Sequence, residues 1–274
     1  MSDALDADAI RAALDVDARA AFAAIEVVDI IDSTNSALLR RRTPDAGLAA
    51  LFAERQDGGR GRHGRVWASP PGANLYLSLA RTFAGDVARL GGLSLVVGVA
   101  AAEALHALGA TEVDLKWPND LVVDDAHGGL RKLGGVLIEG GLQDGRPRAV
   151  IGLGLNVRMP AEAAAAIDQP WTDLHALLGA RTPSRSVVAA TLLSRLASAL
   201  RTFDAEGLRP FLPRFEARDA LRDLQVTARI GEREVLGIAS GLDDDGALVL
   251  RTRDGPLRLH AGEVSVRRQA GSTT

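Results

Sequence analysis

The sequence contains no cysteine, which excludes disulfide bonds, cysteine-ligated zinc sites and a thiol nucleophile. Aromatic residues are also scarce, at 4% of the 274 residues, so a surface that stacks the bases of a nucleic acid is not expected. Neither sign of charge dominates, because 32 lysines and arginines against 35 aspartates and glutamates give a net charge of -3. We therefore expect no nucleic-acid partner held by phosphate contacts.

Long apolar segments are missing as well. The most apolar stretch, residues 90–102, contains Gly91, Gly92 and Gly98 and is shorter than the roughly 20 apolar residues that cross a bilayer. The N-terminus is acidic, unlike a secretory signal. Hydrophobic residues make up 47% and charged residues 24%, as in a globular protein with a sizeable core. These features predict a soluble, cytoplasmic protein with no membrane partner.

Apolar periodicity divides the chain into three parts. Residues 3–28 place apolar residues three or four apart, which predicts one leader helix before Asp29. Helices and strands then alternate, with strands expected at 48–53, 75–79, 113–116, 121–123, 133–139 and 149–157, and helices at 36–42, 86–108, 161–167, 172–179 and 184–218. Prolines 210 and 213 interrupt the last helix.

The tail changes character near Arg222. Five short alternating strands are expected at 225–230, 234–241, 247–252, 257–260 and 263–266, with glycine and aspartate at the turns between them. Short strands at this spacing are typical of a small barrel. The sequence thus predicts an α+β protein with a leader helix at 1–28, a larger mixed-sheet domain packed with helices at 29–222, and a small β-barrel domain at 223–274.

Residues 55–65 form a loop that is rich in glycine and arginine. The loop contains a literal G-x-G-x-x-G, but Pro70 and Pro71 follow soon after it, so no helix opens there to hold a dinucleotide pyrophosphate. Flexible backbone with arginine forks suits a carboxylate or phosphate ligand. A solvated loop with incidental charge remains the alternative.

Other polar clusters each have an ordinary structural interpretation. Residues 116–120, Lys-Trp-Pro-Asn-Asp, resemble a turn, and residues 33–35, Ser-Thr-Asn, resemble a helix cap. Lys132 can guard a strand edge, and Asn156 can end a strand. The five histidines, at positions 63, 106, 127, 175 and 260, are too scattered to predict a metal site.

Taken in order, these clusters resemble the motifs of the biotin protein ligase family over residues 29–158. The matching motifs are Asp32-Ser-Thr-Asn35, Glu54-x-Gln56, Gly59-Arg-Gly-Arg-x-Gly-Arg65-x-Trp67, Asn74-Leu-Tyr-Leu-Ser78, Lys116-Trp-Pro-Asn-Asp120, Lys132-Leu-Gly-Gly135 and Gly152-x-Gly154-x-Asn156. The barrel tail is similar to the small SH3-like C-terminal domain of that family. The resemblance implies an enzyme.

The resemblance also implies a reaction. In this family ATP, with Mg²⁺ present, activates biotin as biotinyl-5′-AMP, and the biotinyl group is then transferred to a lysine of a biotin carboxyl carrier protein, such as that of acetyl-CoA carboxylase. Carried over by motif, the residues expected to contact biotin or its activated carboxylate are Ser33, Thr34, Asn35, Gln56, Arg60, Gly61, Arg62 and Lys132. Those expected at the nucleotide are Trp67, which would stack on adenine, Lys116, Asn119 and Asn156. Asp120 would meet the metal and the incoming amine, and Arg62, Lys132 and Asp120 would be catalytic.

Two departures from the family pattern bear on function. Many members carry an N-terminal winged-helix domain and repress transcription, and the 28 residues before Asp29 are too few for one, so we expect no repressor role. Residues 124–131 are longer than the usual link to the motif lysine. The alternatives are a lipoate protein ligase and a non-catalytic binder, such as a biotin sensor or a peptide-binding module built on the tail barrel. We expect a monomer or a homodimer.

Overall fold

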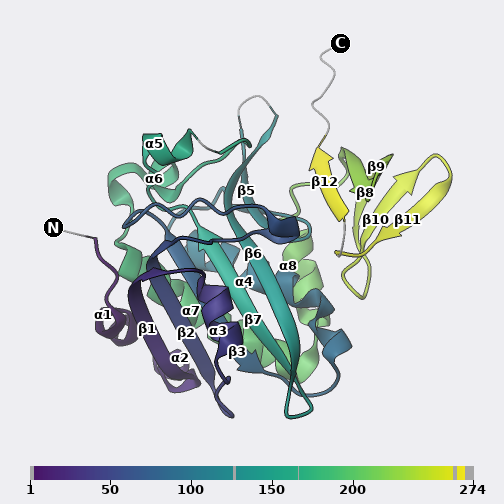
Figure 1. Cartoon of the computed structure of the whole chain (residues 1–274). Helices are drawn as coiled ribbons and strands as arrows, with labels where there is room; N and C mark the ends of the chain where they lie inside the picture. Colours follow the sequence, from purple (N-terminus) through teal and green to yellow (C-terminus); the bar gives the residue numbers. More distant parts are fainter. Residues whose placement is uncertain (1–2, 126–127, 166, 262–263, 269–274) are drawn as a thin grey trace.

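A seven-stranded mixed sheet forms the centre of the larger domain in the computed structural model, which describes residues 3–125, 128–165, 167–261 and 264–268 (Figure 1). The strand order is β1-β2-β3-β7-β6-β5-β4. The strands are β1 (Phe22–Ile31), β2 (Leu48–Gln56), β3 (Leu75–Thr82), β4 (Asp114–Lys116), β5 (Asp120–Asp124), β6 (Leu130–Gln143) and β7 (Arg146–Leu155). Only β1 and β2 pair in parallel, and every other neighbouring pair is antiparallel.

The single leader helix predicted for residues 3–28 is wrong. Two short helices, α1 (Ala7–Ala13) and α2 (Val16–Ala21), are followed by the edge strand β1. Asp15 ends the first helical stripe because its carboxylate caps α2 by accepting the backbone N–H of Ala18. The following segment is rich in β-branched residues, which favour a strand. The spacing of Phe22 and Ile25 therefore reflects two buried positions on a strand.

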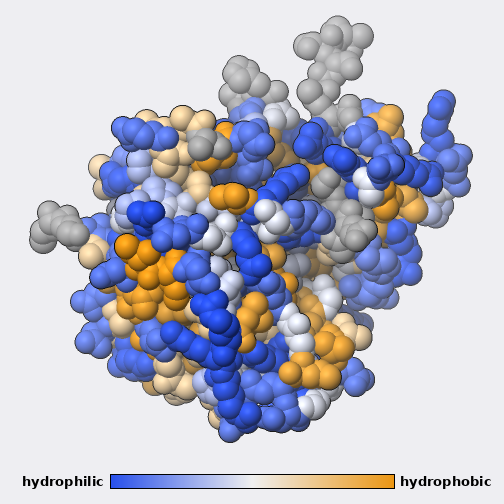
Figure 2. All heavy atoms as spheres, in the orientation of Figure 1, coloured by the Kyte–Doolittle hydropathy of each residue, from blue (hydrophilic) through white to orange (hydrophobic). Residues whose placement is uncertain are grey.

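Helices cover the back of the sheet. These are α4 (Leu93–Ala107), preceded by the 3-10 turn η2 (Val87–Gly92), and α7 (Arg185–Glu206), against which α1 and α2 pack. The continuous helical stretch Val87–Ala107 is 21 residues long, which is longer than the apolar stretch of residues 90–102 noted in the sequence. By length and composition alone, a helix of this kind could cross a membrane. Two thirds of its apolar window is buried inside the protein, as in a core helix. Hydrophilic residues dominate the face seen in Figure 2.

The other helices are short. Helix α7 ends at Glu206, and η4 (Arg209–Phe211) and α8 (Leu212–Glu216) follow, so the predicted interruption of this helix is confirmed. The break itself lies at Gly207, the C-cap with a positive φ, and Pro210 and Pro213 stand in the first turns of the two short helices that follow. Between β7 and α7 lie α5 (Ala161–Ala164), α6 (Leu174–Leu178) and η3 (Gly179–Arg181). Helix α3 (Thr34–Arg40) packs on the opposite face of the sheet over a small apolar cluster that includes Leu38, Leu51 and Val150. The front face beside α3 is thus left open for a site.

A second, five-stranded antiparallel sheet follows at the C-terminal side, in the order β11-β10-β9-β8-β12 (Figure 1). Its strands are β8 (Gln225–Ile230), β9 (Arg233–Leu242), β10 (Leu248–Thr252), β11 (Gly255–Leu259) and β12 (Val264–Arg268). These confirm the expected short strands, although Glu263 lies outside the described residues. Trp117, which is buried, donates from Nε1 to the carbonyl of Gly246 at 3.1 Å and fastens this sheet to the larger domain. The α+β class is confirmed.

Candidate active site

A cavity of about 1000 Å³ lies on the open face of the central sheet, between the Gly/Arg loop and β12. All of the site residues proposed from the sequence line it: Ser33, Thr34, Asn35, Gln56, Arg60, Gly61, Arg62, Trp67, Lys116, Asn119, Asp120, Lys132 and Asn156. These residues come from α3, from β2 and the loop after it, and from the turns and strands β4 to β7. The fold therefore gathers motifs that are spread over more than a hundred positions of the sequence.

One end of the cavity is neutral and polar. Ser33 is the N-cap of α3, and Thr34 follows it on the first turn. The backbone N–H of Thr34 donates to Oε1 of Gln56 at 2.9 Å, and the Thr34 hydroxyl lies 3.1 Å from the same oxygen. Ser78, fully buried on β3, lies 2.7 Å from the Thr34 hydroxyl. This end offers hydroxyl and amide groups with no charge, which suit a neutral polar head.

Asn35 and Arg60 both contact Glu139, beside the neutral end of the cavity. The Asn35 side chain is buried and donates from Nδ2 to Glu139 at 2.8 Å, while its Oδ1 accepts from Ser78 at 2.6 Å. Arg60 pairs with Glu139 at 3.3 Å and donates to the Ser36 hydroxyl at 3.0 Å. Arg60 is thus held against the sheet by the Glu139 carboxylate.

Arg62 reaches from the Gly/Arg loop toward both domains. Its Nη1 donates to Oδ1 of Asn119 at 3.3 Å, and its Nη2 donates to the backbone carbonyl of Ala261 in the second domain. Burial lowers the pKa of the Arg62 guanidinium, and the Asp120 carboxylate opposes that shift. A guanidinium stays protonated at neutral pH all the same, so Arg62 brings a half-buried positive charge to the cavity.

Lys132, Asp120 and Lys116 form a cluster beside Asn119. The Lys132 amine lies 2.6 Å from Oδ1 of Asp120, and the Lys116 amine lies 3.9 Å from Oδ2. Burial lowers the pKa of Lys116, and Asp120 partly restores it. Lys132 reaches the cavity although residues 124–131 form a long link, of which residues 126 and 127 lie outside the described residues. Two ammonium groups against one carboxylate leave this end positive, as an anionic substrate requires.

Trp67 lies flat on β7. A Cβ at Gly154 would stand 2.4 Å from Cε2 of the indole, so only glycine allows this contact. The Lys132 amine is 5.5 Å from the centre of the Trp67 ring, a cation–π distance. The indole Nε1 is buried and has no hydrogen-bond partner among the described residues. The Trp67 ring thus lies beside the cationic cluster, and its indole N–H can donate a hydrogen bond to a ligand.

The Asn156 side chain contacts the backbone on both sides of a short pairing next to the cavity. Its side-chain amide donates to the carbonyl of Thr172 at 3.0 Å and lies 3.5 Å from that of Lys132. The segment 170–172 also pairs with the backbone of Lys132. Asn156 therefore fixes the backbone of the lysine that points into the cavity.

Some cavity residues were missed by the sequence analysis. They include Tyr76 and Ser78 on β3, Leu137 on β6, the segment 167–171, and Arg267 and Arg268 on β12. Ser78 could have been found, because the alternation of Leu75, Leu77 and Leu79 places it on the opposite face of the strand. The β12 arginines could not, since nothing local predicts that the second sheet packs against the cavity.

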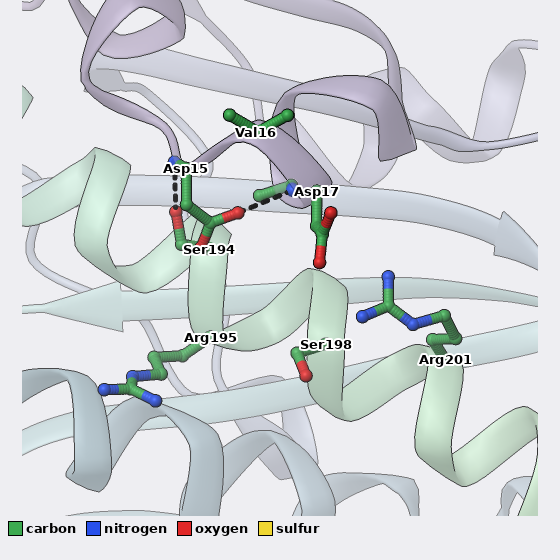
Figure 3. A pocket seen from close by; sticks show the side chains of 8 residues that line it. Asp15, Val16, Asp17, Ser194, Arg195, Ser198 and Arg201 are labelled. Atoms are coloured by element: carbon green, nitrogen blue, oxygen red, sulfur yellow. Dashed lines mark hydrogen bonds between the residues drawn. The ribbon is translucent and has the colours of Figure 1, made fainter.

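A separate hollow of about 370 Å³ lies between α2 and α7 (Figure 3). It is lined by Asp15, Val16, Asp17, Ala18, Ser194, Arg195, Ser198 and Arg201, and none of these belongs to the motifs. The Asp15 carboxylate caps α2, and the backbone N–H of Asp15 donates to the Ser194 hydroxyl. The two arginines lie at opposite ends of the hollow. These contacts hold α2 against α7. We expect the reaction to take place in the larger cavity, which the motif residues line.

The larger cavity suits a substrate with a neutral polar head and an anionic end, placed beside a second anionic substrate. Among the described residues no group of three or more histidines and carboxylates forms a metal cage. Residues 27–156 match the Biotin/lipoate A/B protein ligase family, and residues 225–267 match the Biotin protein ligase C terminal domain. Fold and site together define a ligase of the biotin and lipoate class with an SH3-like second domain.

Individual relatives narrow this class. The chain is 41% identical to the Bifunctional ligase/repressor BirA of Salmonella typhimurium over 96% of its own length and 78% of that protein. It is 35% identical to the Biotin--[acetyl-CoA-carboxylase] ligase of Mycobacterium tuberculosis, with 88% of each chain covered. A biotin protein ligase from Aquifex aeolicus, solved in complex with biotin and ATP, superposes with a TM-score of 0.72 at 28% identity, covering 90% of this chain and 99% of that one.

The chain belongs to the biotin protein ligase family, and it is an enzyme. The family resemblance seen in the motifs is therefore confirmed.

Proposed function

We propose that this enzyme activates biotin as biotinyl-5′-AMP and transfers the biotinyl group to a lysine of a biotin carboxyl carrier protein. A carboxylate oxygen of biotin attacks the α-phosphorus of ATP, and the bond to the β-phosphate breaks to release pyrophosphate. The lysine amine then attacks the acyl carbon, loses a proton, and releases AMP. The observation that carries this proposal is the single cavity that has neutral hydrogen-bonding groups at one end and a cationic cluster at the other.

The residues divide between the two substrates. The neutral biotin head would bind at Ser33, Thr34 and Gln56, with Asn35, Arg60 and Gly61 beside it. Arg62 and Lys132 would offset the repulsion between the biotin carboxylate and the α-phosphate, since aimed cations stabilise charge that develops during attack. Trp67, Lys116, Asn119 and Asn156 would hold the nucleotide. Asp120 would then meet the incoming amine.

Magnesium fits the donors that are present, as a partner of ATP. Mg²⁺ usually keeps several waters and takes one or two carboxylates plus substrate phosphates, so a dedicated cage is not needed. Asp120 is the carboxylate of the cationic cluster and would hold the ion together with the phosphates. The ion would neutralise phosphate charge.

We further propose that this chain acts in the cytoplasm as a modifying enzyme and not as a repressor. Residues 7–31 form α1, α2 and β1, which pack on α7 and on the central sheet, so these described residues form no separate DNA-binding unit. The net charge of -3 gives no broad attraction to DNA.

Biotin and ATP together should raise the melting temperature more than either does alone, because the trapped adenylate occupies both ends of the cavity. A ligand present at 100 times its dissociation constant stabilises the folded state by about 2.7 kcal/mol. Differential scanning fluorimetry with biotin, lipoate and ATP measures this. Stabilisation by lipoate and not by biotin would support the lipoate ligase alternative.

Gly154→Ala should weaken ATP binding about two- to tenfold, because the new methyl group pushes the Trp67 indole off the sheet. The size follows from the loss of an aromatic stack, about 0.5–1.5 kcal/mol. Gly141→Ala, on β6, is the matched control, since a Cβ there meets open space. The KM for ATP of the two variants gives the comparison. Equal KM values would show that Trp67 does not hold the nucleotide.

Arg62→Gly should release biotinyl-AMP into solution, so that lysines of bystander proteins are biotinylated. The change removes the contacts to Asn119 and to the second domain, which hold the loop over the cavity. Arg65→Gly, an exposed change in the same loop, should stay selective. Mass spectrometry of serum albumin added to the assay counts the stray labels. An Arg62→Gly enzyme as selective as the wild type would mean that the loop does not retain the adenylate.

The acceptor is tested by incubating a carboxyl carrier domain with the enzyme, biotin and ATP. Intact-mass analysis should show one added biotinyl group, and the same domain with its acceptor lysine changed to arginine should show none. Biotin-dependent pyrophosphate release without labelling of the carrier would keep the activation step and reject this acceptor.

A further inference from the structure

The front face of β7 supports helix α3 along its length. Successive residues of a strand point to opposite faces, so Arg148, Val150 and Gly152 share the face that carries α3. Val150 belongs to the apolar cluster beneath the helix. A Cβ at Gly152 would stand 2.5 Å from Oδ1 of Asn35, in the first turn of α3. Arg148 contacts the other end of the helix.

The Arg148 guanidinium closes the C-terminal end of α3. Its Nη2 donates to the carbonyls of Leu38 at 2.5 Å and of Arg41 at 2.7 Å. Its Nη1 donates to the carbonyl of Leu39 at 3.3 Å, and its Nε donates to the Thr43 hydroxyl at 2.6 Å. The last carbonyls of a helix have no partner within the helix, and a cation is favourable beside them. All three nitrogens of this side chain are thus used to hold one segment.

Gln143, on the neighbouring strand β6, holds the chain just beyond α3. The backbone N–H of Thr43 donates to Oε1 of Gln143 at 2.9 Å, and Nε2 of Gln143 donates to the carbonyl of Thr43 at 2.9 Å. Between the helix and this contact the chain is extended at Arg41. The end of α3 is therefore fixed to the β6–β7 hairpin by two side chains.

The first turn of α3 depends on its last turn. The helix has seven residues, so the carbonyls of the first turn accept the N–H groups of the last turn, as Ser33 accepts from Ala37 at 2.9 Å. A helix this short is not stable by itself in water. If the last turn unwinds, the carbonyls of Thr34 and Asn35 lose their partners. The side chains of the first turn then lose their fixed places at the cavity.

We infer that Arg148 is a positioning residue for the neutral head of the acid substrate, because it keeps α3 folded along β7. The contacts of Thr34 with Gln56 and Ser78 do not replace it, since they use the N–H and the hydroxyl of Thr34 and leave its carbonyl unsupported. This inference rests on the proposed function, in which Ser33 and Thr34 bind the biotin head.

Arg148→Met should weaken biotin binding about tenfold, because an affinity falls in proportion to the fraction of molecules that hold the binding conformation. The residues proposed for ATP lie outside α3, so the dissociation constant for ATP should not change. Titration calorimetry on the full-length protein gives both constants. In adenylation assays the KM for biotin should rise by the same factor while kcat stays that of the wild type, since saturating biotin restores the helix.

Arg89→Met is the matched control. Arg89 also donates to carbonyls at the end of a helix, those of Phe203 at 3.2 Å and Asp204 at 3.0 Å in α7, and it does not line the cavity. This variant should keep the wild-type affinity for biotin. Hydrogen–deuterium exchange adds a local measurement. Residues 37–41 should exchange faster in Arg148→Met, and biotin should slow them again.

Gln143→Ala tests the same anchor with a milder change. It removes the two bonds to Thr43 and should weaken biotin binding about threefold, so it serves even if Arg148→Met does not fold. An unchanged affinity for biotin in a folded Arg148→Met or Gln143→Ala protein would overturn the inference, and so would an equal loss of biotin and ATP binding. A wild type that does not bind biotin would instead reject the proposed function.

Discussion

Lys132→Gln is expected to form biotinyl-AMP at least about a hundredfold more slowly than the wild type, and to remain folded. The Lys132 amine lies in the cationic cluster, 2.6 Å from Asp120 and over the Trp67 ring. From there it can offset the repulsion between the biotin carboxylate and the α-phosphate. Losing one such preorganised contact typically costs about 10²–10³ in rate. The fold should survive, because the pairing with segment 170–172 uses the backbone of Lys132.

Single-turnover assays separate the two half-reactions. Transfer from synthetic biotinyl-AMP should be affected less, because two anions no longer have to be brought together. Lys132→Arg is the matched control, since it keeps the charge on a different geometry and should retain more adenylation than Lys132→Gln. Near-normal adenylation by Lys132→Gln would show that Lys132 acts only on structure, as a guard of the strand edge.

Arg185→Met is expected to lower the free energy of unfolding by about 3–5 kcal/mol, the usual result of removing one partner of a buried ion pair. The Arg185 side chain is 1% exposed and lies 2.8 Å from Oε2 of Glu54. It also donates to the carbonyls of Asp3 and Asn74, and so ties the N-terminal segment and β3 to the start of α7. Its loss leaves the Glu54 carboxylate without its counter-charge. Urea unfolding followed by circular dichroism measures the change.

Two controls define the origin of that loss. Arg42→Gln breaks an exposed ion pair and should change stability by less than about 1 kcal/mol. Adding Glu54→Gln to Arg185→Met should recover part of the loss, since no carboxylate is then left unpaired. A single Arg185→Met variant as stable as Arg42→Gln would contradict a stabilising role for this buried pair.

Local patterns in the sequence predicted most of the central elements. Alternation and buried runs located β2, β3 and the five strands of the second sheet, and Ser33 was correctly placed as a helix cap. The N-terminal error has a physical cause, because a register shift between Phe22 and Ala24 lets the strand bury Phe22 and Ile25, which are three positions apart as on a helix. Only pairing with β2 decides between a helix and a strand.

The motifs predicted the residues of the candidate site. They did not predict the ion pairs and hydrogen bonds that hold those residues in place. Each site residue proposed from the sequence lines the cavity. The roles of Glu54 and Glu139 depend on partners that are 131 and 79 positions away in the chain, at Arg185 and Arg60. No periodicity reports such pairs, since they arise from how the sheet and helices pack. The contribution of β12 was missed for the same reason.

The central claim, that this cavity joins biotin to ATP, is tested most directly by pyrophosphate release. The purified chain is incubated with Mg²⁺ and ATP, together with biotin, lipoate or no acid, and Lys132→Gln serves as the matched blank. We expect release that depends on biotin, that lipoate does not support, and that falls at least about a hundredfold in the variant. Release with lipoate and not with biotin, or no release with either acid from a folded wild type, would contradict the account.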